Sequence, residues 1–315
     1  MAKTKVITMK DLIDFALKEK YDKVKQLRPK LEDIKKMIDW SSIAESLPQG
    51  KACTGRPPYE QELMIKVLFL QGCYSISDEE MEYQSHNRLD FQSFLDFPKS
   101  IPDYSTIWRF REELTEDDLV DRVWDNIDIQ IRSKGIKIKK GKIQDASFIE
   151  ADPGKKNSGM AGRGREAKTS RSRDGSWTKK GKKNIFGFKS HIKIDDASKI
   201  ITTVGITTAK TYDGNVDLAE PEDIMYRDRG YSGRKTKAKG DGTMKKGKLS
   251  PHDILRNKRI SKKRCRVEHP YGTMNRSFKA GRTKLTTLPR VFIQHVFSCI
   301  AYNLHRLEFL LRNVA

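Results

Sequence analysis

The sequence is poor in cysteine, and it contains no uninterrupted apolar segment long enough to span a membrane. Its four cysteines are widely separated and form no Cys-x-x-Cys pair, so they give neither zinc-binding spacing nor a disulfide framework. This cysteine usage favours a reducing cytosol. The first ten residues lack the apolar core of a signal peptide, and the most apolar stretch, 291–311, is interrupted by charged side chains. We therefore expect a soluble protein with a buried or amphipathic helix over 291–311.

Acidic residues are outnumbered by basic ones. The 315 residues include 63 lysines and arginines against 42 aspartates and glutamates, which gives a net charge of +21. Such an excess predicts a polyanionic partner, because lysines and arginines that bind phosphates release condensed counterions. Nucleic acid is the partner that we expect, although positive charge alone would also suit a membrane surface or a ribosomal context.

The positive charge is concentrated in two segments of the second half of the chain. Residues 151–193 contain 13 basic residues and three acidic ones, and residues 227–267 contain 16 basic residues and three acidic ones. These segments together carry a net charge of +23, so the rest of the chain is nearly neutral. This concentration favours a DNA-binding track over charge that only promotes solubility.

The periodicity of apolar residues divides the chain into a helical part and a mixed part. Apolar residues recur at helical spacing up to about residue 133, and Ser77 with Glu80 forms a capping box. The other expected helices in this part cover 11–20, 27–38, 59–71, 104–113 and 119–131. The last of them would be capped by Thr115 and Asp118. No single DNA-recognition helix can be identified among them.

From Ser133-Lys134-Gly135 onward the pattern changes to alternation, which is typical of strands. Ile136 and Ile138 begin this alternation, and helical spacing returns from Arg276 to the end. The expected strands cover 142–151, 186–195, 199–209 and 223–228. Strands followed by helices around a mixed sheet predict an α/β catalytic domain over 134–315, preceded by an all-helical N-terminal domain over 1–133.

Acidic residues are rare in the basic segments, and three of them occupy informative places. Asp145 lies inside an apolar strand, Asp228 ends another strand, and Glu268 begins a helical region. Three carboxylates that converge at a sheet edge repel one another unless divalent cations neutralise them. Two Mg²⁺ ions roughly 3.5–4 Å apart are the usual arrangement for phosphoryl transfer.

Each of these acids also has an ordinary structural explanation, which the spacing leaves open. An aspartate after a strand is often a turn or cap residue, and Glu268 between Arg264 and Arg266 would suit a surface ion pair. Asp195 and Asp196 are alternative carboxylates near the sheet, although a turn between two strands explains them better.

Several motifs, in a fixed order, surround the three acids. They are "QDASFIEA" (144–151), "DGSWTKKGKKNIFGFKSHIKID" (174–195), "DRGY" (228–231) and "RCRVEHPYG" (264–272). The helical part adds "GRPPYEQELMIKVLFLQGCYSISDEEME" (55–82) and "IPDYSTIWRFREEL" (101–114). Over about residues 50–310 the chain resembles the bacterial insertion-sequence transposases of the DDE class, specifically the "insertion sequence five" group.

The resemblance implies a ribonuclease H-like catalytic domain and a helical N-terminal domain that binds transposon ends. It implies metal-dependent cleavage of double-stranded DNA at terminal inverted repeats, followed by transfer of the freed 3′-hydroxyls to a target. The implied catalytic and metal-binding residues are Asp145, Asp228 and Glu268, with two Mg²⁺ ions, or Mn²⁺, in each site. Because two transposon ends must be paired, it also implies a homodimer on DNA.

Further residues are candidates for supporting roles. The candidate DNA-phosphate contacts are Arg264, Arg266, Arg276, Lys189, Trp177, Lys179 and Lys180. Trp177 would stack on a distorted base or else anchor a long loop on the sheet. His191 and His269 could move protons or position phosphates, although metal-assisted phosphoryl transfer needs no histidine.

The chain departs from the family's signature helix at two positions. Ser261 and Asn275 stand where the family usually has tyrosine and lysine, and Arg276 follows one position later. A degenerate, inactive copy that only binds DNA is therefore the alternative function. An unrelated basic protein such as an RNA chaperone would show neither metal dependence nor a preference for defined DNA ends. The residue set of a tyrosine or serine recombinase is not apparent.

Overall fold

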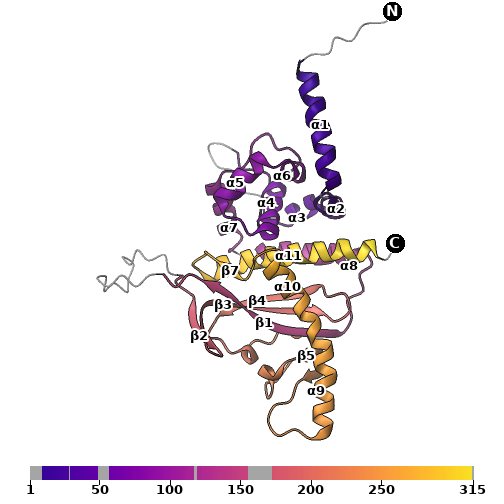
Figure 1. Cartoon of the computed structure of the whole chain (residues 1–315), viewed down its shortest axis with the longest axis vertical. Coiled ribbons are helices and arrows are strands. Elements are labelled where there is room, and N and C mark those ends of the chain that lie inside the picture. Colours follow the sequence, from indigo (N-terminus) through magenta and orange to yellow (C-terminus); the bar gives the residue numbers. More distant parts are fainter. Residues whose placement is uncertain (1–8, 28, 49–56, 117–118, 155–171, 314–315) are drawn as a thin grey trace, which may run out of the picture.

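The computed structural model describes residues 9–27, 29–48, 57–116, 119–154 and 172–313. In Figure 1 a group of helices lies on one side of a mixed sheet, and one long helix, α9, extends from the sheet away from them. The helices before the sheet are α1 (Met9–Leu27), α2 (Pro29–Met37), α3 (Trp40–Glu45), α4 (Gln61–Tyr74), α5 (Asp78–Asn87), α6 (Leu89–Phe94), α7 (Tyr104–Glu113) and α8 (Leu119–Ser133). No described helix is long and apolar enough to cross a membrane.

Of the expected capping box at Ser77 and Glu80, the structure shows the serine half, because the Glu80 carboxylate instead accepts a hydrogen bond from Gln84 Nε2 at 2.5 Å. The Ser77 side chain accepts a hydrogen bond from the Glu80 backbone N–H at 3.2 Å and starts α5. The Asp103 carboxylate accepts one from the Thr106 N–H at 2.7 Å and starts α7. The expected cap at Asp118 lies outside the described residues. The short helices α3 and α6 were not predicted, since six residues are too few to show a helical period.

The sheet has the strand order and directions of the ribonuclease H-like fold, which confirms the predicted fold class. Its strands are β1 (Gly141–Ala151), β2 (Ser176–Lys180), β3 (Lys183–Asp195), β4 (Ile201–Thr208), β5 (Ile224–Arg227), β6 (Gly240–Thr243) and β7 (Arg282–Thr283). The central order is β4-β3-β1-β5-β6, with β3 antiparallel to both of its neighbours and β5 parallel to β1 and β6. β2 pairs with the first part of β3, and β7 pairs with the end of β1.

Two parts of the expected second half differ from the structure. Ile136 and Ile138 form no strand; they pack against the core just before β1. The expected helical stretch from Arg276 onward is interrupted, because residues 277–287 form a connection that includes β7. The helices here are α9 (Pro251–Arg264), α10 (Glu268–Arg276) and α11 (Leu288–Arg312), with the 3-10 turn η3 (Cys265–Val267) between the first two.

Helix α11 joins the helical part to the sheet. It packs against α2, α4 and α8 on one side and against β4 and α10 on the other. The Asn303 amide fixes it to β4, since its oxygen accepts from the Ile201 N–H at 2.9 Å and its nitrogen donates to the Ile201 carbonyl at 2.8 Å. One continuous apolar core therefore runs from the N-terminal helices through α11 to the inner face of β1, β3 and β4.

The crossing of α4 and α11 depends on a glycine. A Cβ atom on Gly72 would lie 2.5 Å from the Phe297 carbonyl oxygen and 2.7 Å from its carbon. Gly72→Ala should therefore lower the free energy of unfolding by about 1–3 kcal/mol, although alanine is the better helix former. Gly272→Ala in α10 is the matched control, because a Cβ there meets nothing within 4 Å. It should leave stability unchanged or raise it by up to about 1 kcal/mol. Denaturant unfolding measures both, and a Gly72→Ala protein as stable as wild type would contradict the close crossing.

Candidate active site

Asp145 lies in the middle of the central strand. Its backbone is paired with Ile192 of β3, and its carboxylate accepts a hydrogen bond from Arg264 Nη1 at 2.9 Å. Its side chain is 21% exposed. Burial raises the pKa of the carboxyl to about 6, against the opposing effect of Arg264, and the nearby charge of Asp228 raises it further. The strand thus holds an acid whose ionised form is costly.

Asp228 directly follows β5, the strand that lies beside β1. The parallel register pairs Ile143 of β1 with Tyr226 of β5, and Asp145 and Asp228 lie two residues beyond this last pair, near enough for the charge of Asp228 to raise the pKa of Asp145. The Asp228 carboxylate accepts the Gly230 N–H at 2.8 Å, which starts the 3-10 turn η2 (Arg229–Tyr231). The expected convergence of two strand aspartates at one place in the sheet is therefore present.

Glu268 is the first residue of α10. It directly follows the 3-10 turn η3, which packs on β1. One turn later the buried Tyr271 hydroxyl lies 3.0 Å from the Asp145 carbonyl oxygen and 3.1 Å from that of Ser190, so its single proton serves these two acceptors. This contact anchors the first turn of α10 over the strand position of Asp145. The Glu268 side chain itself is exposed and forms no ion pair with another described residue.

The two arginines beside Glu268 are paired with other acids. Arg264 bonds Asp145, and Arg266 Nη1 donates to the Asp196 carboxylate at 2.8 Å and to its carbonyl at 2.9 Å. Neither arginine therefore explains Glu268 as a surface ion pair. The alternative carboxylate Asp195 is fully buried, and it accepts backbone N–H groups of its own turn, including that of Ser198 at 2.7 Å. Asp195 is a turn residue, as the sequence suggested.

The side chains at this place are of the right type to bind a hard divalent cation, but too few of them lie close together. Asp145 and Asp228 offer carboxylate oxygens, which are the ligands that Mg²⁺ and Mn²⁺ take. Across the described part of the chain, however, no three histidine, cysteine, aspartate or glutamate side chains are near enough to one another to hold a metal ion. The two aspartates fit the expected site, and Glu268 would have to turn toward them.

Of the candidate phosphate contacts, Lys189 departs from expectation. It is buried, and its ammonium donates to the Thr211 carbonyl at 2.7 Å and lies 2.8 Å from the Asp213 carboxylate. An ammonium committed in this way has no open side for a phosphate. The other candidates that remain exposed are Arg266, Arg276, Trp177, Lys179 and Lys180, the last three on β2.

Two residues near the aspartates were not recognised as site residues from the sequence. Tyr231, the last residue of the "DRGY" motif, is buried, and its hydroxyl has no hydrogen-bond partner among the described residues. Burial raises the pKa of Tyr231, and the charges of Asp213, Asp145 and Asp228 act in the same direction. Asp213 starts the 3-10 turn η1 (Asp213–Asn215) and pairs with Lys189. Only the tyrosine carried a sequence signal, its place in the motif.

The two histidine candidates are held by structural contacts. His191 Nε2 lies 2.9 Å from the Thr207 hydroxyl, and burial lowers the pKa of His191 to about 4, so the ring is neutral at pH 7. His269 Nδ1 lies 3.0 Å from the Tyr302 hydroxyl, and burial together with Lys199 lowers its pKa. Neither ring bonds Asp145 or Asp228.

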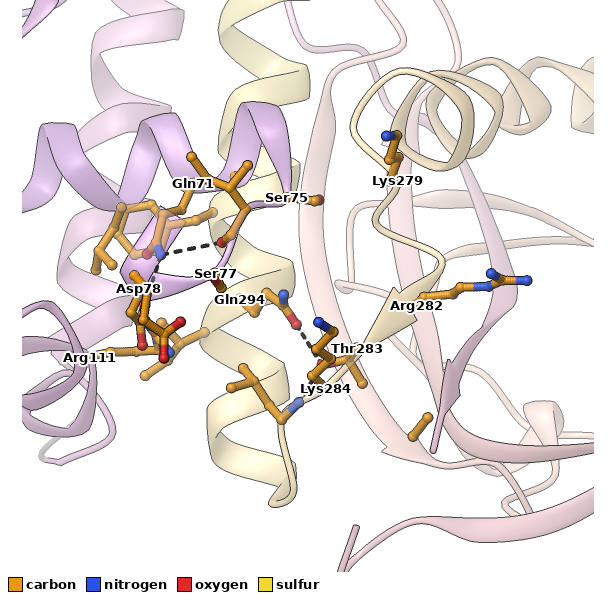
Figure 2. A pocket seen from close by; sticks show the side chains of 18 of the residues that line it. Gln71, Ser75, Ser77, Asp78, Arg111, Lys279, Arg282, Thr283, Lys284 and Gln294 are labelled. Atoms are coloured by element: carbon orange, nitrogen blue, oxygen red, sulfur yellow. Dashed lines mark hydrogen bonds and ion pairs between the residues drawn. The ribbon is translucent and has the colours of Figure 1, made fainter. Parts of the chain in front are cut away.

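A cavity of about 720 Å³ lies away from these residues, between α4–α5 and the β7 connection. In Figure 2, Gln71, Asp78 and Arg111 lie on one wall and Lys279, Arg282 and Lys284 on the other. Its charges are balanced, because Arg111 pairs with Asp78, and Arg282 lies 3.8 Å from Glu150. Glu150 is five residues beyond Asp145 on β1, about 17 Å along the strand. The cavity therefore lacks the features of the expected site.

Two family models match the chain. Residues 17–113 match the Transposase domain (DUF772), and residues 138–304 match the Transposase DDE domain. The second match covers more than half of the chain and includes Asp145, Asp228 and Glu268. No solved structure matches the chain. The resemblance to DDE transposases is thus confirmed, while the narrower "insertion sequence five" group stays a prediction.

The raised pKa of Asp145 predicts a pH-dependent difference in stability in the absence of metal. Below about pH 4 Asp145 is protonated in the folded and unfolded protein alike, and above its folded pKa of about 6 the folded protein carries the costly charge. Relative to wild type, Asp145→Asn should therefore gain about 1–3 kcal/mol of stability as the pH rises from 4 to 7.

Asp253→Asn is the control, since hydrogen bonds with Lys245 and Ser250 lower the pKa of Asp253 to about 2. Its contribution is complete above pH 4, so its difference from wild type should stay constant between pH 4 and 7. Unfolding titrations at several pH values measure both differences. A flat profile for Asp145→Asn would mean that its carboxyl is ordinary.

Proposed function

This chain belongs to the DDE transposase family and acts on DNA, and we propose that it cuts at the terminal inverted repeats of a mobile element and transfers the freed 3′-hydroxyls to a target. The observation that carries the proposal is the placement of Asp145 on β1 close to Asp228, which follows the parallel strand β5, with α10 anchored to β1 through Tyr271. Pairing two DNA ends requires two such sites, so we propose a homodimer on DNA.

We propose that Asp145, Asp228 and Glu268 hold the divalent cations that DDE domains use, two Mg²⁺ ions with Mn²⁺ as a substitute. Such cations lower the pKa of the attacking water or 3′-hydroxyl and stabilise the leaving oxygen. The Gly230 N–H orients the Asp228 carboxylate, and Arg264 offsets the charge of Asp145 in the metal-free protein. Glu268 lies at the start of a helix whose position relative to β1 is set by the Tyr271 hydroxyl.

The carboxylates are tested by substitution. Asp145→Ala, Asp228→Ala and Glu268→Ala should each reduce metal-dependent cleavage at least about a thousandfold, because the three act as one unit. Binding to a duplex with the inverted repeats should stay within a few-fold of wild type. The assay follows strand cleavage on a DNA fragment that carries the flanking inverted repeats, with Mg²⁺ or Mn²⁺.

Asp196→Asn is the matched control, since it removes a carboxylate near the sheet that pairs with Arg266. Its cleavage rate should stay within about tenfold of wild type. Full cleavage by Asp228→Ala would overturn the assignment. Tight, specific binding by a wild-type protein that cuts nothing would favour the inactive-copy function instead.

The signature position at Asn275 provides a gain-of-function test. Asn275 follows Glu268 by seven residues, nearly two helical turns, so both point to the same side of α10, whereas Arg276 is turned by about 100°. Asn275→Lys should therefore place a cation beside the scissile phosphate and raise the cleavage rate about tenfold, or about 1.4 kcal/mol. Ser277→Lys adds the same charge on the opposite side of the helix and should leave the rate unchanged. Equal rates for both variants would remove Asn275 from the phosphate site.

A further inference from the structure

The two parts of the chain carry opposite net charges. Residues 1–133 contain 20 lysines and arginines against 25 aspartates and glutamates, a net charge of −5. Residues 134–315 contain 43 basic residues against 17 acidic ones, a net charge of +26. Duplex DNA is drawn to a protein mainly by phosphate contacts that displace counterions. We therefore expect the electrostatic attraction to come mainly from the second part, while binding of transposon ends by the helical part stays a prediction.

Helix α9 concentrates this charge in a rigid element. It contains six basic residues and a single acid, Asp253, whose carboxylate caps the helix at Ser250 and bonds Lys245 at 2.7 Å. On its inner side Ile260 is buried, and the Asn257 amide accepts from the Lys245 N–H at 2.9 Å and donates to the Lys245 carbonyl at 3.0 Å. The helix is thus held by its inner side and leaves its outer side to solvent.

Three of the six basic side chains are used within the protein. Arg256 donates to the carbonyl oxygens of Thr243 at 2.7 Å and Asp241 at 3.0 Å. Lys263 donates to the Tyr226 hydroxyl at 2.7 Å, and Arg264 bonds Asp145. The other three, Lys258, Arg259 and Lys262, are exposed and form no ion pair with a described residue. We call these three side chains the basic face of α9.

We propose that the basic face of α9 is the main phosphate-binding track for duplex DNA and leads the DNA backbone to the carboxylates. Positions 258, 259 and 262 lie on one side of the helix. The same helix ends at Arg264, which bonds Asp145, and Lys258 is about 9 Å along the helix axis from Arg264. In Figure 1 α9 extends beyond the sheet on the side opposite the N-terminal helices. That the DNA is led to catalytic carboxylates rests on the proposed function, whereas the binding of DNA by α9 does not.

The test is the salt dependence of binding. Each lost phosphate contact should reduce the slope of log affinity against log salt concentration by about 0.9. The triple variant Lys258→Gln, Arg259→Gln, Lys262→Gln should therefore bind a linear duplex with a slope shallower by about 2–3. Fluorescence anisotropy across a salt series, with a chelator present, measures this without cleavage. A companion variant that keeps the charges, Lys258→Arg, Arg259→Lys, Lys262→Arg, should retain the wild-type slope.

The matched control removes three exposed charges from α1: Lys18→Gln, Lys20→Gln, Lys23→Gln. Its slope should stay close to that of wild type. An unchanged slope for the α9 triple variant, or an equal reduction for the α1 triple variant, would overturn the proposal. Because binding is measured without metal, a protein that never cleaves DNA would still show the predicted slopes. Failure of the proposed function and failure of this inference are therefore distinguishable.

Discussion

The parallel pairing of β1 with β5 forces two carboxylates to share one place in the sheet. Asp145 lies on β1 and Asp228 directly follows β5, so the pairing of these strands keeps the two acids near each other, and burial makes the ionised form of Asp145 costly. In the metal-free protein Arg264 supplies the compensating charge. A pair of acids held together against their mutual repulsion is the arrangement that divalent cations resolve. Asp145 also helps to position α9 and α10, because Arg264 at the end of α9 bonds its carboxylate and Tyr271 of α10 bonds its carbonyl oxygen.

The sheet that carries this pair of acids is packed against α11 and the N-terminal helices. α11 fills the space between the inner face of the sheet and the N-terminal helices, and its Asn303 amide holds β4 by two hydrogen bonds. The helical part therefore shares a core with the sheet and packs on the side away from α9 (Figure 1). The net negative charge of that part and the net positive charge of the second part suit this division, with packing on one side and DNA on the other.

Much of this arrangement could be predicted from local patterns. The alternation around Asp145 gave β1 to within one residue, and helical spacing gave both ends of α7. Short strands such as β2 and β7 could not be predicted, because their hydrogen bonds depend on partners far along the chain. Lys189 was misplaced for a related reason: a lysine on a strand is normally exposed, and only the fold brings Asp213 and Thr211 to its ammonium. Helix α9 was not predicted, because its sequence is a run of charged residues without apolar residues at regular helical spacing.

Anomalous scattering from crystals grown with Mn²⁺ and a DNA end would locate the metal without reference to cleavage activity. A metal-binding role for these acids predicts a peak within bonding distance of carboxylate oxygens of both Asp145 and Asp228, with Glu268 turned toward it as a further ligand. Manganese bound elsewhere, with Arg264 still on Asp145, would contradict it.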